Sequence, residues 1–243
     1  MLQVFIGHDG RMPDVARVAA FSLRRRASVP VDVALLDRDA LRARGLFARE
    51  EDPKASTEFT YTRFLAPSLA GYAGQALLCD NDFLWLGDVA DLFAEAEAQP
   101  GRPLWCVQHD YVPTATTKMD GQEQSAYPRK NWSSMMLFDA GHPSSRALTP
   151  EAVNERSPAW LHRMQWLDDA TLGAVSERWN WLEGWHSGSP ERLPGAIHHT
   201  MGGPWFTECA GVDFADLRRA ERDAREGAGR PEADAPRESL PRP

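Results

Sequence analysis

The 243-residue sequence has few cysteines, no excess of positive charge and no long apolar run, and each absence excludes a class of protein. The three cysteines are odd in number and widely spaced, so they predict neither a disulfide framework nor a zinc cluster. The net charge of −8 argues against a nucleic-acid-binding protein, because phosphate recognition of that kind needs a basic surface. No stretch approaches the roughly 18 apolar residues of a membrane helix, and residues 1–6 lack a signal-peptide pattern. We therefore expect a cytoplasmic protein without a transmembrane segment.

The composition, 42% hydrophobic and 26% charged, is typical of a globular protein, and the length allows one large domain or two small ones. After residue 214 the sequence alternates small, charged and turn-forming residues, almost without large apolar side chains. We expect a charged surface helix at 216–226 and a disordered tail at 227–243, because the tail cannot bury enough apolar surface to fold. The pattern predicts a single domain at 1–214 and a C-terminal appendage at 215–243.

The beginning of the sequence has the pattern of a nucleotide-binding sheet. A strand composition at 2–6 is followed by a Gly-flanked turn at 7–10, a helix pattern at 13–25 and a second strand pattern at 31–36. Two strands joined by a helix predict a parallel pair with a right-handed crossover. The turn lacks the third glycine of a dinucleotide fingerprint, which argues against an NAD site.

The main candidate for a functional site is the Asp-Asn-Asp sequence at 80–82. It follows an apolar run at 76–79 that has the length of a buried strand, and apolar residues resume directly after Asp82. In an open α/β sheet, ligands bind outside the carboxyl ends of the strands. Asp80 and Asp82 could hold a divalent cation there, and the cation could hold phosphates. A plain turn is the alternative, since Asp and Asn both favour turns.

Other candidate residues each have an ordinary structural alternative. Asp9 could bind a base or ribose, or it could cap the following helix. Arg63 could neutralise phosphate, or it could pair with an acid on a helix surface. Lys130 and Asn131 precede a buried strand pattern and could contact an anionic or hydroxylated ligand, or lie at a solvated loop edge. The polar run at 113–128 is long enough to be a substrate-binding loop or a lid.

Two patterns late in the chain add an acid pair and a histidine pair. Asp168 and Asp169 are adjacent, and because neighbouring helical residues do not share a face, at most one of them is expected to point into a pocket. His198 and His199 precede a Gly-Gly-Pro turn, and either could supply an imidazole ligand or be a structural residue. The tryptophans between residues 160 and 185 could stack on sugar rings, although most are expected to lie in the core.

In this order, the motifs resemble those of the retaining glycosyltransferases of the family-8 type, the group that includes glycogenin and the bacterial lipopolysaccharide galactosyltransferases. The shared order is a strand ending at His8-Asp9, a Phe-x-x-x-Arg-Phe-x-x-Pro segment, a Leu-Leu-Cys-Asp-x-Asp strand end, an Asn before a buried strand, an acid pair, and a late His-x-x-Gly-x-Pro-Trp. The resemblance covers residues 2–206. It implies the α/β GT-A fold of nucleotide-diphospho-sugar transferases, with a Rossmann-like, mixed but mostly parallel central sheet flanked by helices.

The resemblance also implies an activity and roles for particular residues. The activity is transfer of a hexose from a UDP-sugar to a carbohydrate or glycolipid acceptor, such as a bacterial surface glycan. Asp80, Asp82 and His199 would bind the metal, with His198 as a rival to His199; mixed carboxylate and imidazole ligation favours Mn²⁺ over Mg²⁺. The remaining roles fall on the donor site (His8, Asp9, Arg63, Asn81, Lys130, Asn131, Gly202) and on the reaction centre (Asp168, Asp169).

One departure from the family pattern keeps two alternatives open. The family lysine that grips the diphosphate is absent, because Gly203 directly precedes Pro204. This motivates the first alternative, a non-catalytic relative that binds a nucleotide sugar. The second is a metal-dependent nucleotidyltransferase, although the turn at 7–10 does not resemble a Gly/Lys-rich phosphate loop. We expect no nucleic-acid partner, and a homodimer stays open.

Overall fold

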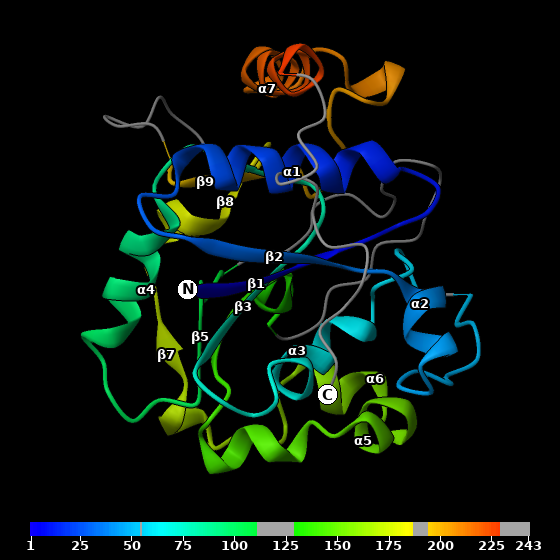
Figure 1. Cartoon of the computed structure of the whole chain (residues 1–243), viewed down its shortest axis with the longest axis vertical. Helices are drawn as coiled ribbons and strands as arrows, with labels where there is room; N and C mark the ends of the chain where they lie inside the picture. The colour runs from blue at the N-terminus through cyan, green and yellow to red at the C-terminus, as the bar shows by residue number, and fades with distance from the viewer. Residues whose placement is uncertain (54, 111–128, 187–193, 229–243) are drawn as a thin grey trace.

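The computed structural model describes residues 1–53, 55–110, 129–186 and 194–228. Its centre is a six-stranded sheet in the order β2-β1-β3-β6-β5-β7 (Figure 1). The strands are β1 (Leu2–Gly7), β2 (Val31–Leu36), β3 (Gln75–Cys79), β5 (Leu104–Cys106), β6 (Met135–Asp139) and β7 (Gly173–Ala174). Only β6 runs against its neighbours, β3 and β5, within the described sheet. The predicted mostly parallel α/β sheet is thereby confirmed.

Each face of the sheet carries its own core, because successive residues of a strand point to opposite sides. Phe5 belongs to one core, while Val4 and Ile6 belong to the other. The core around Phe5 is covered by α2 (Arg38–Ala43), η1 (Thr62–Leu65), α3 (Ala66–Leu69), α5 (Pro150–Glu155) and α6 (Pro158–His162). The opposite core is covered by α1 (Pro13–Arg26) and α4 (Val89–Glu97).

A second, three-stranded sheet begins where β3 ends. Its order is β4-β9-β8, with β4 (Phe83–Trp85), β8 (Trp181–Leu182) and β9 (Ala196–His198). Residues 80–82 therefore form the crossing from the large sheet to the small one. Phe83 pairs with His198 in the β4–β9 register, so the chain returns beside the crossing from more than a hundred residues away. Short 3-10 helices complete the described fold: η3 (Trp132–Ser134), η4 (Pro143–Ala147), η5 (Asp169–Thr171), η6 (Glu177–Asn180) and η7 (Thr207–Cys209).

The C-terminal helix α7 (Ala215–Gly227) packs on α1 (Figure 1). Glu221 Oε1 accepts a hydrogen bond from Arg26 Nη2 at 2.6 Å, although the sequence predicted a charged surface helix. Glu221 is in fact only 5% exposed. The domain boundary at 214 stays a prediction. Most of the predicted disordered tail, and the predicted lid at 113–128, lie outside the described residues.

Among the described helices, none has both the length and the apolar composition needed to cross a membrane.

His162, the last residue of α6, is a titratable side chain packed against the first core. Its ring meets Phe64 edge-on with ring centroids 5.1 Å apart, and its Nδ1 lies 3.0 Å from Ser133 Oγ. Burial lowers the pKa of His162 to about 3, helped by the positive charges of Arg63 and Arg49. The folded protein therefore keeps this imidazole neutral.

We expect this histidine to make folding stability fall in mild acid. Between a pKa of about 6.5 in the unfolded chain and the lower folded value, the unfolded chain binds more protons, so stability is lost as the pH falls through that window. Between pH 7 and pH 5, the unfolding free energy of the wild type should fall by about 2 kcal/mol more than that of His162→Gln, measured by urea denaturation. The control is Ser157→Ala, which removes the N-terminal cap of α6 but no ionisable group, so it should lower the unfolding free energy equally at both pH values. Equal pH dependence in the wild type and His162→Gln would contradict this account.

Candidate metal and donor site

The Asp-Asn-Asp sequence lies at the carboxyl end of β3, where the sequence places the site. The backbone N–H of Asp80 donates to Ser134 O at 2.8 Å, and the backbone carbonyl of Asp82 accepts from His199 N at 3.3 Å. These bonds connect the short segment to η3, directly before β6, and to the residue directly after β9. Both carboxylates are partly buried, with side chains 14% and 15% exposed.

His198 joins these two carboxylates in one compact group. One ligand atom from each of Asp80, Asp82 and His198 lies within 4.8 Å of the others. The imidazole Nε2 of His198 is 3.4 Å from Asp82 Oδ1, and the His198 side chain is 3% exposed. Ligand atoms that each lie about 2.1 Å from one ion are at most about 4.2 Å apart, so small adjustments would bring all three onto a divalent cation.

A hydrogen-bond chain decides which nitrogen of His198 faces Asp82. Asn180 Nδ2 donates to Ser134 Oγ at 2.9 Å, and that hydroxyl donates to Asn131 O at 2.6 Å. The remaining amide oxygen of Asn180 lies 2.9 Å from His198 Nδ1. Because an amide oxygen only accepts, Nδ1 carries a proton, and in the neutral tautomer this leaves the Nε2 lone pair facing the carboxylate. Two lone pairs at this distance repel unless a cation or proton lies between them, so the donor set fits a metal.

His199 lies on the other side of the strand end, since neighbouring residues of a strand point to opposite faces. Its Nδ1 is 3.3 Å from the carbonyl oxygen of Asp82, and its ring is edge-on to Trp205. Burial lowers the pKa of His199 to about 4, so the ring is neutral at pH 7. The resemblance assigned the ligand to His199, whereas the structure brings His198, the rival, to the carboxylates. The ligand role itself stays a prediction.

Arg63 places a positive charge beside the group. Its Nη1 lies 2.7 Å from Asp80 Oδ1 and donates to Ser133 O at 2.8 Å. The guanidinium also lies over the Phe59 ring, 5.2 Å from its centroid. The sequence left Arg63 with two roles, to neutralise phosphate or to pair with an acid. The structure shows an ion pair, and the acid is Asp80 of the candidate site. One arginine thus offsets one of the two carboxylate charges.

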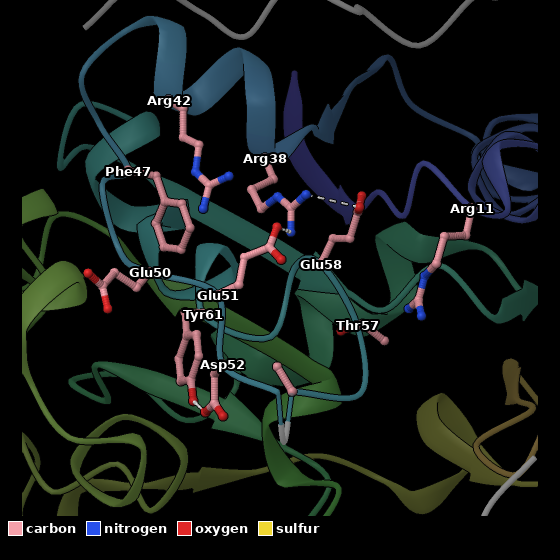
Figure 2. Close-up of a pocket in the computed structure, with 11 residues that line it drawn as sticks. Arg11, Arg38, Arg42, Phe47, Glu50, Glu51, Asp52, Thr57, Glu58 and Tyr61 are labelled. Atoms are coloured by element: carbon pink, nitrogen blue, oxygen red, sulfur yellow. Dashed lines mark hydrogen bonds and ion pairs between the residues drawn. The ribbon is translucent and has the colours of Figure 1, made fainter. Parts of the chain in front are cut away.

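A cavity of about 240 Å³ lies beside the carboxyl ends of β1 and β2 (Figure 2). Its charged lining is Arg11, Arg38, Arg42, Glu50, Glu51, Asp52 and Glu58, and Phe47 and Tyr61 supply aromatic faces. Figure 2 shows Arg38 directed toward Glu58, with Nη2 and Oε1 3.2 Å apart. The cavity therefore offers donors, acceptors and ring faces together, which suits a polar ring such as a nucleobase.

His8 and Asp9 follow β1 at the edge of this region. The carboxylate of Asp9 is fully buried and binds Arg11 through both oxygens, at 2.8 and 2.6 Å. Burial by itself would raise the pKa of Asp9, but the Arg11 hydrogen bonds and charge hold it below its usual value. The alternative that Asp9 caps α1 is wrong, because Met12 is the N-cap and no side chain caps that helix end. Asp9 instead orients Arg11, which lines the cavity; His8 Nε2 lies 3.7 Å from Asp37 Oδ2.

Four further predicted donor-site residues lie in the segments that meet at the carboxylates. Asn81 and Lys130 are buried, at 4% and 5% exposure. Asn131 has a left-handed backbone with φ of 65°, and its carbonyl accepts the Ser134 bond described above. Gly202 has φ of 118°, a conformation that favours glycine, and its N–H donates to His199 O at 2.9 Å.

The predicted acid pair is placed differently. Asp168 is the exposed N-cap of η5 and accepts a hydrogen bond from Ala170 N at 3.0 Å. Asp169 is exposed and forms an ion pair with Arg129. The two residues thus begin a 3-10 turn rather than a helix face, and their described partners lie outside the Asp80–Asp82–His198 group. Their catalytic role stays a prediction.

Sequence reasoning missed three residues that shape the site. Asn180 orients His198, Arg11 lines the cavity, and Arg218 of α7 reaches the strand that follows Asp82. A polar residue between two tryptophans was a signal for Asn180, since a buried polar group needs a hydrogen-bond partner. Arg218 had no such signal, because it is one of several arginines in a charged helix.

A curated relative is similar to nearly the whole chain. Protein CDI of Arabidopsis thaliana is 42% identical over 235 residues, which cover 96% of this chain and 90% of that protein. No family model matches the chain.

Solved glycosyltransferase structures share the fold at low sequence identity. The apo form of GlyE from Streptococcus pneumoniae TIGR4 aligns with a TM-score of 0.59 and 15% identity over 91% of this chain, which spans only 60% of that chain. The galactosyltransferase LgtC, solved with donor and acceptor sugar analogues, aligns with a TM-score of 0.57 and 11% identity over 92% of this chain and 96% of its own. These similarities confirm the predicted GT-A fold.

We expect Asn180→Ala to weaken metal binding without unfolding the protein. Removing the acceptor of His198 Nδ1 frees the ring to rotate and change tautomer, and loss of such a partner typically costs 10–100-fold in metal affinity. Titration calorimetry with Mn²⁺ alone measures the effect. The matched control is Asn154→Ala. It removes a surface hydrogen bond that is donated by Ala48 N, from a residue distant from Asn154 in the sequence. Wild-type Mn²⁺ affinity in Asn180→Ala would rule out the orienting role.

Proposed function

We propose that this chain, which belongs to the same family as Protein CDI of Arabidopsis thaliana, is a metal-dependent glycosyltransferase with a nucleotide-sugar donor. The observation that carries the proposal is the convergence of Asp80, Asp82 and the Nε2 atom of His198 at the carboxyl end of β3. This is the edge where open α/β sheets bind their ligands. The GT-A fold supports the same conclusion.

The donor we propose is a UDP-hexose. Its diphosphate would lie at the carboxylates, and its nucleoside would lie in the cavity lined by Arg11, next to His8. Asp9 would act indirectly, by holding Arg11. The sugar would then reach the segment around Asn131, whose side chain lies 3.5 Å from Thr200 Oγ1.

The chemical task is to let the nucleoside diphosphate leave while the anomeric carbon gains positive charge. A divalent cation bound here, Mn²⁺ rather than Mg²⁺ given the imidazole ligand, would stabilise the negative charge of the leaving group as a Lewis acid. Arg63, whose Nη1 lies 2.7 Å from Asp80 Oδ1, would place its positive charge beside the leaving group. Arg63 and Lys130 would share the role of the family lysine that this sequence lacks. Retention of anomeric configuration is part of the proposal, with Asp168 or Asp169 as the acid near the acceptor.

An aromatic cluster beside the site supports a carbohydrate or glycolipid acceptor. The rings of Trp181 and His186 lie 4.6 Å apart, and those of His109 and His186 lie 5.8 Å apart. Trp181 follows Asn180 directly, so this cluster adjoins the hydrogen-bond chain of His198. Flat rings of this kind can stack on the apolar face of a sugar. A bacterial surface glycan, a cytoplasmic location and a homodimer stay predictions from the sequence.

The first test is titration calorimetry of UDP and a panel of UDP-hexoses, with Mn²⁺ and then with EDTA. We expect Mn²⁺-dependent binding that Asp80→Asn and Asp82→Asn each weaken at least about 10-fold, because each variant removes one charged ligand. The matched control is Asp139→Asn at the end of β6. Asp139 pairs with Gln75 at the start of β3, so it lies at the opposite end of this strand from Asp80 and Asp82.

Slow hydrolysis of the donor, followed by NMR of the released sugar, then separates an enzyme from a non-catalytic binder. Metal-dependent binding without hydrolysis would favour the non-catalytic relative. Full Mn²⁺-dependent binding in both aspartate variants would overturn the metal site.

A further inference from the structure

Arg218, in the first half of α7, is a buried arginine that joins three distant parts of the chain. It is 4% exposed. Its Nη1 donates to Phe83 O at 2.6 Å, and its Nη2 donates to Val15 O at 2.8 Å. Its guanidinium lies over the ring of Trp205, 5.0 Å from the ring centroid. A single side chain thus connects α7 to β4, to α1 and to the late Gly-Gly-Pro-Trp segment.

The contacts of Arg218 surround one end of the candidate metal site. Phe83 directly follows Asp82, so the Arg218 bond to its carbonyl oxygen restrains the Phe83–Leu84 peptide group, one residue beyond the Asp82 side chain. The Trp205 ring on which the guanidinium lies also packs edge-on against His199. His199 in turn contacts the carbonyl of Asp82. Arg218 therefore supports the Asp82 backbone from two directions.

Arg218 carries a positive charge that interacts with Asp82. Burial lowers the pKa of Arg218 to about 10, while the charges of Asp82 and Glu221 oppose that shift. The guanidinium is therefore a cation at neutral pH, and it interacts with Asp82.

We propose that Arg218 is a positioning residue for the metal site, and that α7 is therefore part of the functional domain rather than an appendage. The inference rests on the proposed metal site at Asp80, Asp82 and His198. Arg218 holds the β4 backbone at Phe83, so that the Asp82 carboxylate is aimed at His198 Nε2 before the metal binds. Without it, the metal must order that segment as it binds, and affinity falls.

The alternative is that Arg218 only anchors α7. The helix α7 offers a separate anchor for comparison. Its residue Glu221 binds Arg26 of α1, with Oε1 and Nη2 2.6 Å apart, and makes no described hydrogen bond or ion pair with β4. Loss of the Glu221 charge should loosen α7 without altering the Phe83 carbonyl. Arg219 is a second comparison, since its guanidinium binds Asp216 and Ala210 O at the surface.

The test measures Mn²⁺ affinity by titration calorimetry and Tm by calorimetric scanning for the wild type, Arg218→Lys, Glu221→Gln, Arg219→Lys and Asp82→Asn. Arg218→Lys keeps the charge but cannot serve both carbonyls, and we expect it to bind Mn²⁺ about 10-fold more weakly. Glu221→Gln should lower Tm while its Mn²⁺ affinity stays within about twofold, and Arg219→Lys should change neither. Arg218→Met, which removes both hydrogen bonds, should also bind Mn²⁺ more weakly than the wild type; if it does not fold, Arg218→Lys carries the test.

The outcomes separate this inference from the proposed function. If the wild type binds Mn²⁺ and Asp82→Asn does not, an unchanged affinity in Arg218→Lys overturns the positioning role alone. A loss of affinity in Glu221→Gln equal to that in Arg218→Lys also overturns it, because helix docking would then be the cause. Absence of Mn²⁺ binding by the wild type overturns the metal site and this inference together.

Discussion

Two carboxylates held at the end of a buried strand are stable only if positive charge is held beside them. Two unit charges about 4 Å apart repel by about 4 kcal/mol at the effective dielectric constant near a protein surface. Asp80 is met by Arg63, and Asp82 lies 3.4 Å from the imidazole Nε2 of His198. Arg218 stands behind Asp82. The two arginines balance the two carboxylates, and the three donor atoms that converge between them could still hold a divalent cation.

The fold creates this arrangement by changing sheets at the carboxylates. The chain leaves the large sheet at Cys79 and enters the small one at Phe83, so the three residues between them belong to neither ladder. Their backbone groups are instead bonded by the segment before β6 and by the residue after β9. Because both segments arrive from elsewhere in the chain, the site forms only when the two sheets are assembled. The orientation of His198 therefore depends on Asn180 and Ser134, although neither residue has a proposed role in binding the substrate.

The missing lysine of the late motif changes how an anionic donor could be held. The turn at Gly203 packs closely against Trp205, and a side chain at that position would collide with the indole. The segment therefore supplies packing beneath Arg218 in place of a long cationic side chain. Positive charge enters the region from Arg63 on η1 and from Arg11 at the cavity, both oriented by buried or partly buried carboxylates. Donor recognition by this chain would then depend more on preorganised arginines than on one flexible lysine.

The sequence alone determined the features that depend on local pattern. The early strand–helix–strand unit, the strand at 75–79 and the carboxylates at its end follow from short apolar runs and turn residues, whose effects act within a few positions. The order of motifs was enough to predict the GT-A fold. Only the tertiary structure decided between His198 and His199, because that choice depends on the register of β9 against β4, and a shift of one residue turns a side chain to the opposite face. The burial of Arg218 was also decided by the tertiary structure. Its two hydrogen bonds join positions separated by 135 and 203 residues, and contacts over such separations leave no periodic pattern in the sequence.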